Sequence, residues 1–240
     1  MSSNRIWLRP TLQLDVHHPK IHFTGLKLTQ SHQSVARRVG SIRDFIRRMP
    51  FRASQDRGRI SASDVLDQRA GDCHTKGLLF TALCRTSDIP ARLRFFRIRT
   101  GFLKGLLDYG PDTVAHAVGQ ALVDGKWIST DTYVIDPQLF VQALNRQRAA
   151  SQGRDFATRL DCRVQWDGTS DSIQHFRPED VVHDYGAFDD VAHFHRSEGA
   201  APGWLSRVKY SLEAHAVNQR VGALRRVLAA SQDDKAALAG

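Results

Sequence analysis

Paired cysteines and long apolar runs are both missing from this chain. The 240 residues include three cysteines, Cys73, Cys84 and Cys162, and no Cys-x-x-Cys motif occurs. Three cysteines cannot all pair, so a disulfide framework or a cysteine zinc site is not expected. No segment approaches the ~18 consecutive apolar residues that a transmembrane helix requires. We therefore expect a globular chain without a membrane span.

The first twenty residues also lack the apolar segment of a secretory signal peptide. They carry charged and histidine residues instead: Arg5, Arg9, Asp15, His17 and His18. Together with the unpaired cysteines, this predicts a reducing, cytoplasmic location of the bacterial type. An apolar fraction of 41% over 240 residues is enough for one domain, or for one domain with extensions.

Lysine is scarce: 7 lysines stand against 27 arginines, within a formal net charge of +9. Arginine suits bidentate contact with carboxylates or phosphates, which brings an acidic partner or a nucleic acid into consideration. Eight arginines fall in 35–59, together with an apolar stripe at helical spacing, formed by Val35, Val39, Ile42, Ile46 and Met49. Phe45 is expected on the buried side, which leaves no aromatic platform for bases. We expect a helix at 34–49 with a solvated arginine face and no nucleic-acid site.

The segment Gly71-Asp72-Cys73 has the features of a helix start. Asp72 is a suitable N-cap, and the residues through Arg85 place four apolar side chains on one face: Leu78, Leu79, Ala82 and Leu83. As the first helical residue, Cys73 would meet free backbone N–H groups and the positive end of the helix dipole, which favour a thiolate. Its own N–H is a candidate oxyanion-hole donor. The alternative interpretation is a small cysteine of the core.

Residues 114–134 have the pattern of a β-hairpin. Two runs rich in β-branched residues, 114–123 and 126–134, flank Asp124-Gly125. This dipeptide is the preferred pair for a two-residue type I′ turn, which sets the register of the two strands.

In that register Val118 lies opposite Asp131, and His116 shares a face with Val118 because side chains alternate along a strand. His116 and Asp131 are therefore diagonal neighbours within reach of one hydrogen bond. Cys73, His116 and Asp131 together supply a nucleophile, a general base and a group that orients the base. Asp136 is the rival acid, and a histidine of a half-buried strand is the alternative for His116.

Four motifs in this order resemble the transglutaminase-like superfamily, a branch of the papain-like cysteine enzymes. They are Gly71-Asp72-Cys73, Ser87-Asp88-Ile89-Pro90-Ala91-Arg92, His116-Ala117 and Trp127-Ile128-Ser129-Thr130-Asp131. The resemblance covers 61–136 and implies an α+β fold in which the Cys73 helix packs on an antiparallel sheet. It implies acyl transfer through a thioester, with Cys73, His116 and Asp131 as the catalytic residues.

The chain departs from the family pattern at two positions. Val118 replaces a tryptophan that often follows His-Ala, and Asp88 replaces the glycine of the helix-ending turn. The first departure affects the shape of the substrate pocket. The arylamine N-acetyltransferases use the same order of residues, but the Arg-Gly-Gly that usually precedes their cysteine is Arg69-Ala70-Gly71 here.

The remaining segments divide the chain into a core and extensions. We expect a strand extension at 1–30, with one strand from Ile21 to Leu28, and a catalytic core at 31–140. A turn-rich extension, 141–202, would pack on the core, and 203–240 would form an amphipathic helix and a frayed tail. A short helix at 63–69, a strand at 91–99 and helical residues at 138–150 complete the outline. The glycine-rich segment 100–113 is either a lid over the site or a packed connection.

The C-terminal half is rich in histidine, with His175, His183, His193 and His195. A His-x-His pair such as His193 and His195 can bind metal from a strand, but surface histidines are the favoured interpretation. No calcium loop of the Asp-x-Asp-x-Asp-Gly type occurs. The site is thus predicted to use no cofactor and no metal.

Its expected substrates are peptides, proteins or small molecules with an amide or ester bond. Water as acceptor would make the protein a hydrolase, and an amine would make it a transamidase. Gln68 is a candidate for the second oxyanion donor. The competing hypotheses are a non-catalytic anion- or nucleic-acid-binding protein on the same fold and a metal-dependent hydrolase built on the C-terminal histidines.

Overall fold

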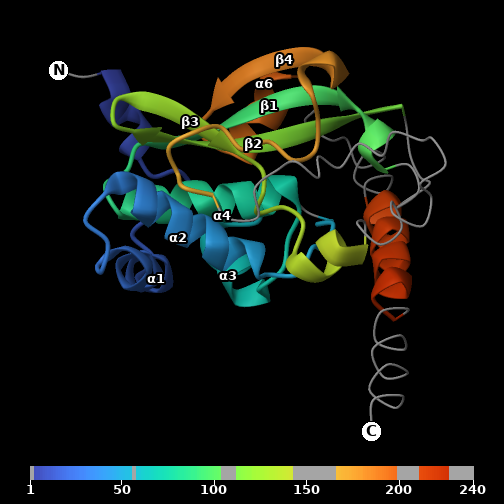
Figure 1. Cartoon of the computed structure of the whole chain (residues 1–240), viewed down its shortest axis with the longest axis horizontal. Coiled ribbons are helices and arrows are strands. Elements are labelled where there is room, and N and C mark those ends of the chain that lie inside the picture. The colour runs from blue at the N-terminus through green and yellow to red at the C-terminus, as the bar shows by residue number, and fades with distance from the viewer. Residues whose placement is uncertain (1–2, 56–57, 104–111, 143–165, 199–210, 227–240) are drawn as a thin grey trace, which may run out of the picture.

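The computed structural model describes residues 3–55, 58–103, 112–142, 166–198 and 211–226. In these ranges it shows a mixed fold of helices and one antiparallel sheet, as predicted (Figure 1). None of the described helices combines the length and apolarity required to cross a membrane. Residues 104–111 of the glycine-rich segment, residues 143–150 of the predicted helix at 138–150 and the tail from 227 onward lie outside the described residues.

The sheet has the strand order β3-β2-β1-β4, and every neighbouring pair is antiparallel. The strands are β1 (Ala91–Arg99), β2 (Thr113–Val123), β3 (Lys126–Thr130) and β4 (Val181–Phe188). The predicted strands at 91–99 and 114–123 are therefore confirmed. The strand predicted at 126–134 ends four residues early. β4 lies in the segment predicted to be turn-rich, and it pairs with β1 through two register shifts.

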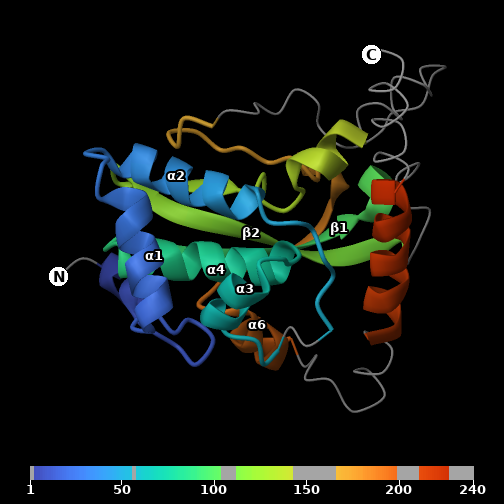
Figure 2. The ribbon, with the colours of Figure 1, turned by 90° about the horizontal axis from the view of Figure 1, so that it is seen from below.

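Four helices precede the sheet in the chain and lie together on one of its faces (Figures 1 and 2). They are α1 (Pro19–Thr29), α2 (Val35–Arg47), α3 (Ala62–Gln68) and α4 (Cys73–Thr86). A short helix, α6 (Val191–Ser197), follows β4, and residues 137–142 and 211–226 are also helical. Short 3-10 segments occupy Ser3–Leu8, Thr100–Leu103 and Pro178–Asp180.

α4 is the central helix of the core, because it is buried from His74 through Arg85. Two glycines let it lie close to β1 and β2. A Cβ on Gly119 would meet the Phe80 ring at 2.6 Å, and one on Gly77 would meet Leu93 Cδ2 at 2.8 Å. Cys84 is fully buried in the same cluster, as predicted for an ordinary core cysteine, and burial raises the pKa of its thiol.

The strand predicted between Ile21 and Leu28 is wrong, since these residues lie in helix α1. Pro19 stands in the first turn, where proline is tolerated, and the side chain of His18 caps the helix. The buried residues Ile21, Gly25 and Thr29 recur every four positions, while Phe23 between them is 71% exposed. A strand would bury Phe23 on the same face, so this pattern is helical. The N-terminal segment thus joins the helical layer, whereas the division of the chain into a core and extensions stays a prediction.

The predicted helix at 34–49 is α2, and its apolar stripe is buried as expected. The expectation that its arginines are all solvated is wrong for two of them. Arg43 is fully buried, paired with Asp44 at 2.9 Å and placed over the Trp166 ring. Arg47 is 8% exposed and lies over the Phe140 ring. These two guanidinium groups pack with aromatic rings, and they are not available to phosphates.

Residues 211–226 confirm the described part of the predicted C-terminal helix. It stands at one end of the sheet, apart from the layer formed by α1 to α4 (Figures 1 and 2). Val221 and Leu224 pack in a small separate cluster with Ile135, Leu139 and Phe140. Its predicted stripe is incomplete, because Leu212 is 66% exposed.

Candidate active site

Asp72 caps α4, so Cys73 begins the helix as predicted. The Asp72 carboxylate accepts the backbone N–H groups of His74 and Thr75, both at 3.1 Å, and the Asp72 N–H donates to the Thr75 hydroxyl. Gly71 is required before this cap, because a Cβ there would come 2.4 Å from Thr75 Oγ1. The capping box leaves the thiol of Cys73 at the positive end of the helix dipole.

The Cys73 thiol is half-buried and has imidazole neighbours on two sides. Its Sγ lies 3.2 Å from Nδ1 of His74, and it also interacts through charge and a side-chain hydrogen bond with His116. Burial alone would raise the pKa of Cys73, but the charges of His74 and His116 outweigh it and hold that pKa well below its ordinary value. These surroundings thus favour the thiolate form of Cys73.

The hairpin has the predicted register, from Val123 opposite Lys126 to Gly119 opposite Thr130. Asp124 and Gly125 take φ values of 48° and 80°, as a type I′ turn requires. Asp131 is the first residue beyond the paired part of β3 and is fully buried. Its Oδ2 lies 3.0 Å from Nε2 of His116, so the predicted hydrogen bond is present.

Opposite charges on both sides of His116 favour its protonated form. Burial would lower the pKa of this imidazole, yet the Cys73 thiolate and the bond to Asp131 raise it to about 10. Asp131 shows the reverse effect: burial would raise its pKa, but the charge of His175 and the bond to His116 lower it well below the usual range. The surroundings therefore favour a thiolate at Cys73, an imidazolium at His116 and a carboxylate at Asp131.

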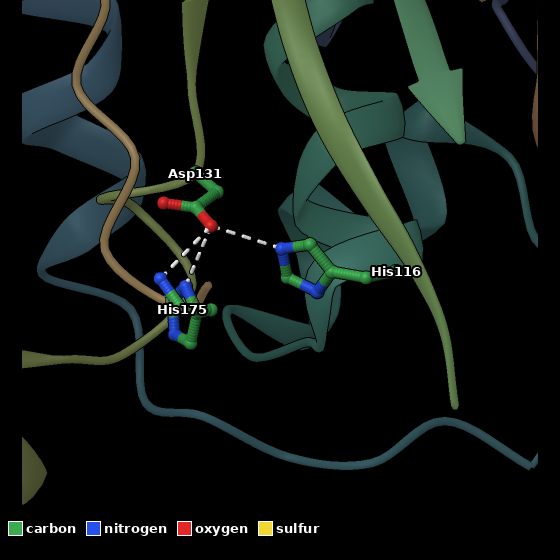
Figure 3. A group of neighbouring side chains, drawn as sticks. All are labelled: His116, Asp131 and His175. Atoms are coloured by element: carbon green, nitrogen blue, oxygen red, sulfur yellow. Dashed lines mark hydrogen bonds and ion pairs between the residues drawn. The ribbon is translucent and has the colours of Figure 1, made fainter. Parts of the chain in front are cut away.

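His175 completes the surroundings of Asp131. The expectation of a surface histidine is wrong for it, because it is 2% exposed. Its Nδ1 lies 2.9 Å from Asp131 Oδ2, and its own backbone N–H donates to the same oxygen (Figure 3). The backbone N–H of Gln174 donates to Oδ1 at 2.6 Å. The segment is brought here by backbone pairing of Ser172 with Ser129 and Asp131. No spacing signal in the sequence connects positions 131 and 175.

His116, Asp131 and His175 form the one group among the described residues whose ligand atoms lie close enough to hold a metal ion, all within 4.8 Å. The Asp131 carboxylate, however, already accepts two backbone N–H groups and faces two imidazoles. The lone pairs of this carboxylate are thus already used by donors of the protein itself, and the group is a hydrogen-bond network centred on Asp131.

The predicted pair of His193 and His195 does not form a metal site, because both lie on helix α6 and not on a strand. Two residues apart on a helix, they point in different directions: His193 is exposed near Asp189, and the His195 ring is parallel to that of His74. The metal-dependent hydrolase loses the geometry on which it was based.

The rival acid Asp136 has a different role. It pairs with Arg225 from the helix at 211–226 and accepts the backbone N–H of Phe51 at 2.8 Å. Burial would raise its pKa, but the Arg225 guanidinium lowers it. Gln68, the candidate oxyanion donor, has an exposed side chain at the end of α3. Cys162 lies outside the described residues.

The segment 50–54 lies beside the start of α4 and is held from three sides. Phe51 forms a β-bridge with Gly71, and Ser54 N–H donates to Asp72 Oδ2 at 3.0 Å. Asn218 accepts the N–H of Ala53 at 2.8 Å and donates to its carbonyl at 2.9 Å. The C-terminal helix is therefore anchored next to the cap that positions the nucleophile.

Lys76 secures the same region from inside α4. It is fully buried, and its Nζ donates to the carbonyl oxygens of Met49, Tyr133 and Val134 at 2.6, 3.0 and 2.9 Å. Burial lowers the pKa of Lys76 to about 7, against the opposing charge of Asp136. This side chain joins the end of the α2 segment to the turn that follows Asp131.

A surface depression of about 540 Å³ lies elsewhere, between residues 11–13, 58–59 and 189–196. None of Cys73, His116 and Asp131 lines it. We therefore place the chemistry at the start of α4 and not in this depression.

Residues 24–132 match the sequence model of the transglutaminase-like superfamily. A candidate cysteine protease from Cytophaga hutchinsonii is 26% identical, with a TM-score of 0.47 over 57% of this chain and 44% of that protein. A candidate protease from Parabacteroides distasonis is 17% identical, with a TM-score of 0.37 over 55% of this chain and 27% of that one.

No curated protein matches the chain. The two structures align over less than half of their own lengths. The family match contains Cys73 and His116 and extends one residue past Asp131. Residues 24–132 therefore match the transglutaminase-like superfamily, the family that the four motifs resemble.

Proposed function

We propose that the protein is a cysteine-dependent enzyme that transfers acyl groups from amide or ester substrates through a thioester. The family match supports a cysteine-dependent enzyme in general. One observation carries the finer proposal: His116 bonds Asp131 through Nε2 at 3.0 Å. This bond leaves Nδ1 as the ring nitrogen that can serve the thiol, which is the arrangement that acyl transfer needs.

In the first step the Cys73 thiolate attacks the carbonyl carbon, and the negative charge moves to the carbonyl oxygen. The backbone N–H of Cys73, at the first position of α4, has no acceptor within its helix and can donate to that oxygen. His116 gives its proton to the leaving amine or alcohol as the tetrahedral intermediate collapses. Asp131 holds the imidazole in the required orientation and stabilises its cation.

The second step depends on the acceptor. Water, activated by neutral His116, hydrolyses the thioester, whereas an amine takes the acyl group in a transamidation. We favour hydrolysis or transfer to a small molecule over protein crosslinking, since no calcium loop of the Asp-x-Asp-x-Asp-Gly type occurs in the sequence. An acyltransferase that resembles the arylamine N-acetyltransferases belongs to the same proposal.

The acyl-enzyme can be tested directly with p-nitrophenyl butyrate. We expect a burst of p-nitrophenol and one butyryl group on the Cys73 peptide, detected by mass spectrometry of the quenched protein. Cys73→Ala should abolish both signals. Cys84→Ala is the matched control, and it should keep them. Acylation at Cys84, or a burst that survives Cys73→Ala, would contradict the proposal.

A further inference from the structure

The thiol of Cys73 has a second imidazole neighbour that the proposed mechanism does not use. His74 follows it directly in α4, and His74 Nδ1 lies 3.2 Å from Cys73 Sγ. A cysteine–histidine pair for acyl transfer needs one imidazole to exchange the proton, and His116 meets that need. The position of His74 therefore requires a separate account.

The surroundings of His74 hold its ring in place. The residue is 1% exposed, and its backbone N–H is bonded to Asp72. Its ring centroid lies 5.6 Å from that of Phe95 on β1 and 6.1 Å from that of His195 on α6, the latter at an interplanar angle of 8°. Because a strand and a second helix contact the ring, Nδ1 is kept near the sulfur.

Several titratable groups face this pair from the elements around it. Asp72 precedes the thiol, and Lys76 lies one turn further along α4. His116 comes from β2, and His195 comes from α6. Beyond β3, Asp131 bonds His116, and Tyr133 interacts with Cys73 through charge. Of all these groups, His74 has the strongest opposing effect to burial on the ionisation of Cys73, followed by His116.

We propose that His74 is a positioning residue for the nucleophile: its Nδ1–H donates a hydrogen bond to the Cys73 thiolate and holds the sulfur in place independently of His116. The inference rests on the proposed function of Cys73. During attack the charge leaves Sγ for the carbonyl oxygen, and His74 keeps its proton. His116 alone transfers a proton, to the leaving group. The resting thiolate thus has two donors, one of which is not consumed by the reaction.

This division of roles has a measurable consequence. When a thiolate depends on one imidazole alone, removal of that imidazole returns the thiol to an ordinary pKa of about 8.5. With His74 in place, loss of His116 should stop turnover but leave a thiol that still reacts at pH 6. Loss of His74 should leave turnover in place but lower the reactivity of the thiol at pH 6.

Iodoacetamide labelling of Cys73 against pH, followed by peptide mass spectrometry, separates the two roles without requiring turnover. In His74→Leu we expect the rate at pH 6 to fall at least about tenfold, which corresponds to a rise of one unit in the thiol pKa. His74→Asn, of similar shape, retains an N–H near the position of Nδ1 and should keep most of the rate. His116→Phe should keep more of the rate at pH 6 than His74→Leu.

His195→Phe is the control for packing, because it preserves a ring beside His74 and should leave the labelling unchanged. His74→Phe is the second variant if His74→Leu fails to fold, which a thermal melt decides. The inference is overturned if both His74 variants label like the wild type, or if Asn fails to rescue. It is also overturned if His116→Phe alone removes labelling at pH 6. Loss of the acyl-enzyme with an intact labelling pattern would instead contradict the proposed function.

Discussion

The groups on the two sides of the His116 imidazole, the thiol and the carboxylate, are positioned in different ways. On the thiol side, the cap of α4 places Cys73 and His74 through hydrogen bonds among residues 72–75, all close in sequence. On the carboxylate side, Asp131 is surrounded by donors from His116, Gln174 and His175, which lie 15 to 44 positions away. The nucleophile is thus set by local structure, whereas the acid depends on a loop that folds back from beyond β3.

Substitutions on the two sides should therefore differ in their effects on activity and on stability. A change at the thiol removes chemistry and leaves the fold, because the cap is formed by backbone and Asp72. A change at Asp131 removes an acceptor from several buried donors at once, so it should reduce both activity and stability.

Cys73→Ala should have the largest effect on activity. We expect the first-step rate to fall by at least about a thousandfold, since no other nucleophile can form the thioester. The melting temperature should stay close to that of the wild type, because the side chain is small and half-buried. Pre-steady-state release of p-nitrophenol and a thermal melt measure the two. Substantial unfolding of Cys73→Ala would contradict the expectation that a change at the thiol leaves the fold intact.

His116→Ala should reduce turnover about as much as Cys73→Ala, and the double variant should add little, because residues that act as one unit are not additive. Asp131→Ala should be milder in turnover, about a hundredfold, because His116 keeps its place on β2. It should also lower the free energy of unfolding by about 3 kcal/mol, as buried donors lose their acceptor. Full additivity of the two catalytic substitutions would contradict a shared mechanism.

The pH dependence of the acylation rate tests the protonation state of His116. His116 must be protonated to release the leaving group, and its pKa is raised to about 10. The rate should therefore hold through neutral pH and decline as the pH rises through about 10. Asp131→Asn removes a carboxylate that supports this protonation, so the alkaline limb should move to lower pH. An alkaline limb near pH 6.5 in the wild type would contradict this assignment.

His175→Gln should show a smaller effect, confined to the carboxylate side. The substitution weakens the support of Asp131, so we expect turnover to fall about tenfold. Iodoacetamide labelling of Cys73 should not change, because His175 lies against Asp131 and not against the thiol. His183→Gln, on the exposed part of β4, is the matched control for loss of a histidine. A large change in labelling would indicate that the two sides are not separate.

Arg225→Ala should have the smallest effect on the chemistry and act on stability. Arg225 lowers the pKa of Asp136, so this pair stabilises the fold above the unfolded pKa of about 3.9. The stabilisation is lost as pH falls through the lower folded pKa. We expect a loss of about 1 kcal/mol at pH 7 that disappears at strongly acid pH, measured by urea unfolding. Arg226→Ala, exposed on the same helix, is the control.

Much of the core could be predicted because its signals are local. Asp72, the apolar face of α4 and the Asp124-Gly125 turn each have one favourable local structure, and together they place His116 beside Asp131. The sequence did not reveal α1, where Ile21 and Leu28 suggested a strand. The helix there depends on Gly25, which lets it pack against α4, where a Cβ would come 2.4 Å from Thr86. The burial of Arg43 and Arg47 was also missed, since their aromatic partners Trp166 and Phe140 are distant in sequence.

The sequence by itself determined the helix start at Cys73, the register of the hairpin and the family model that residues 24–132 match. These follow from capping, turn chemistry and strand alternation, which act over a few residues. Only the tertiary structure decided that His175 joins Asp131, that His74 touches the thiol and that Asn218 anchors the segment 50–54. Such contacts connect separate elements or depend on a rotamer that packing selects, and no local pattern encodes either.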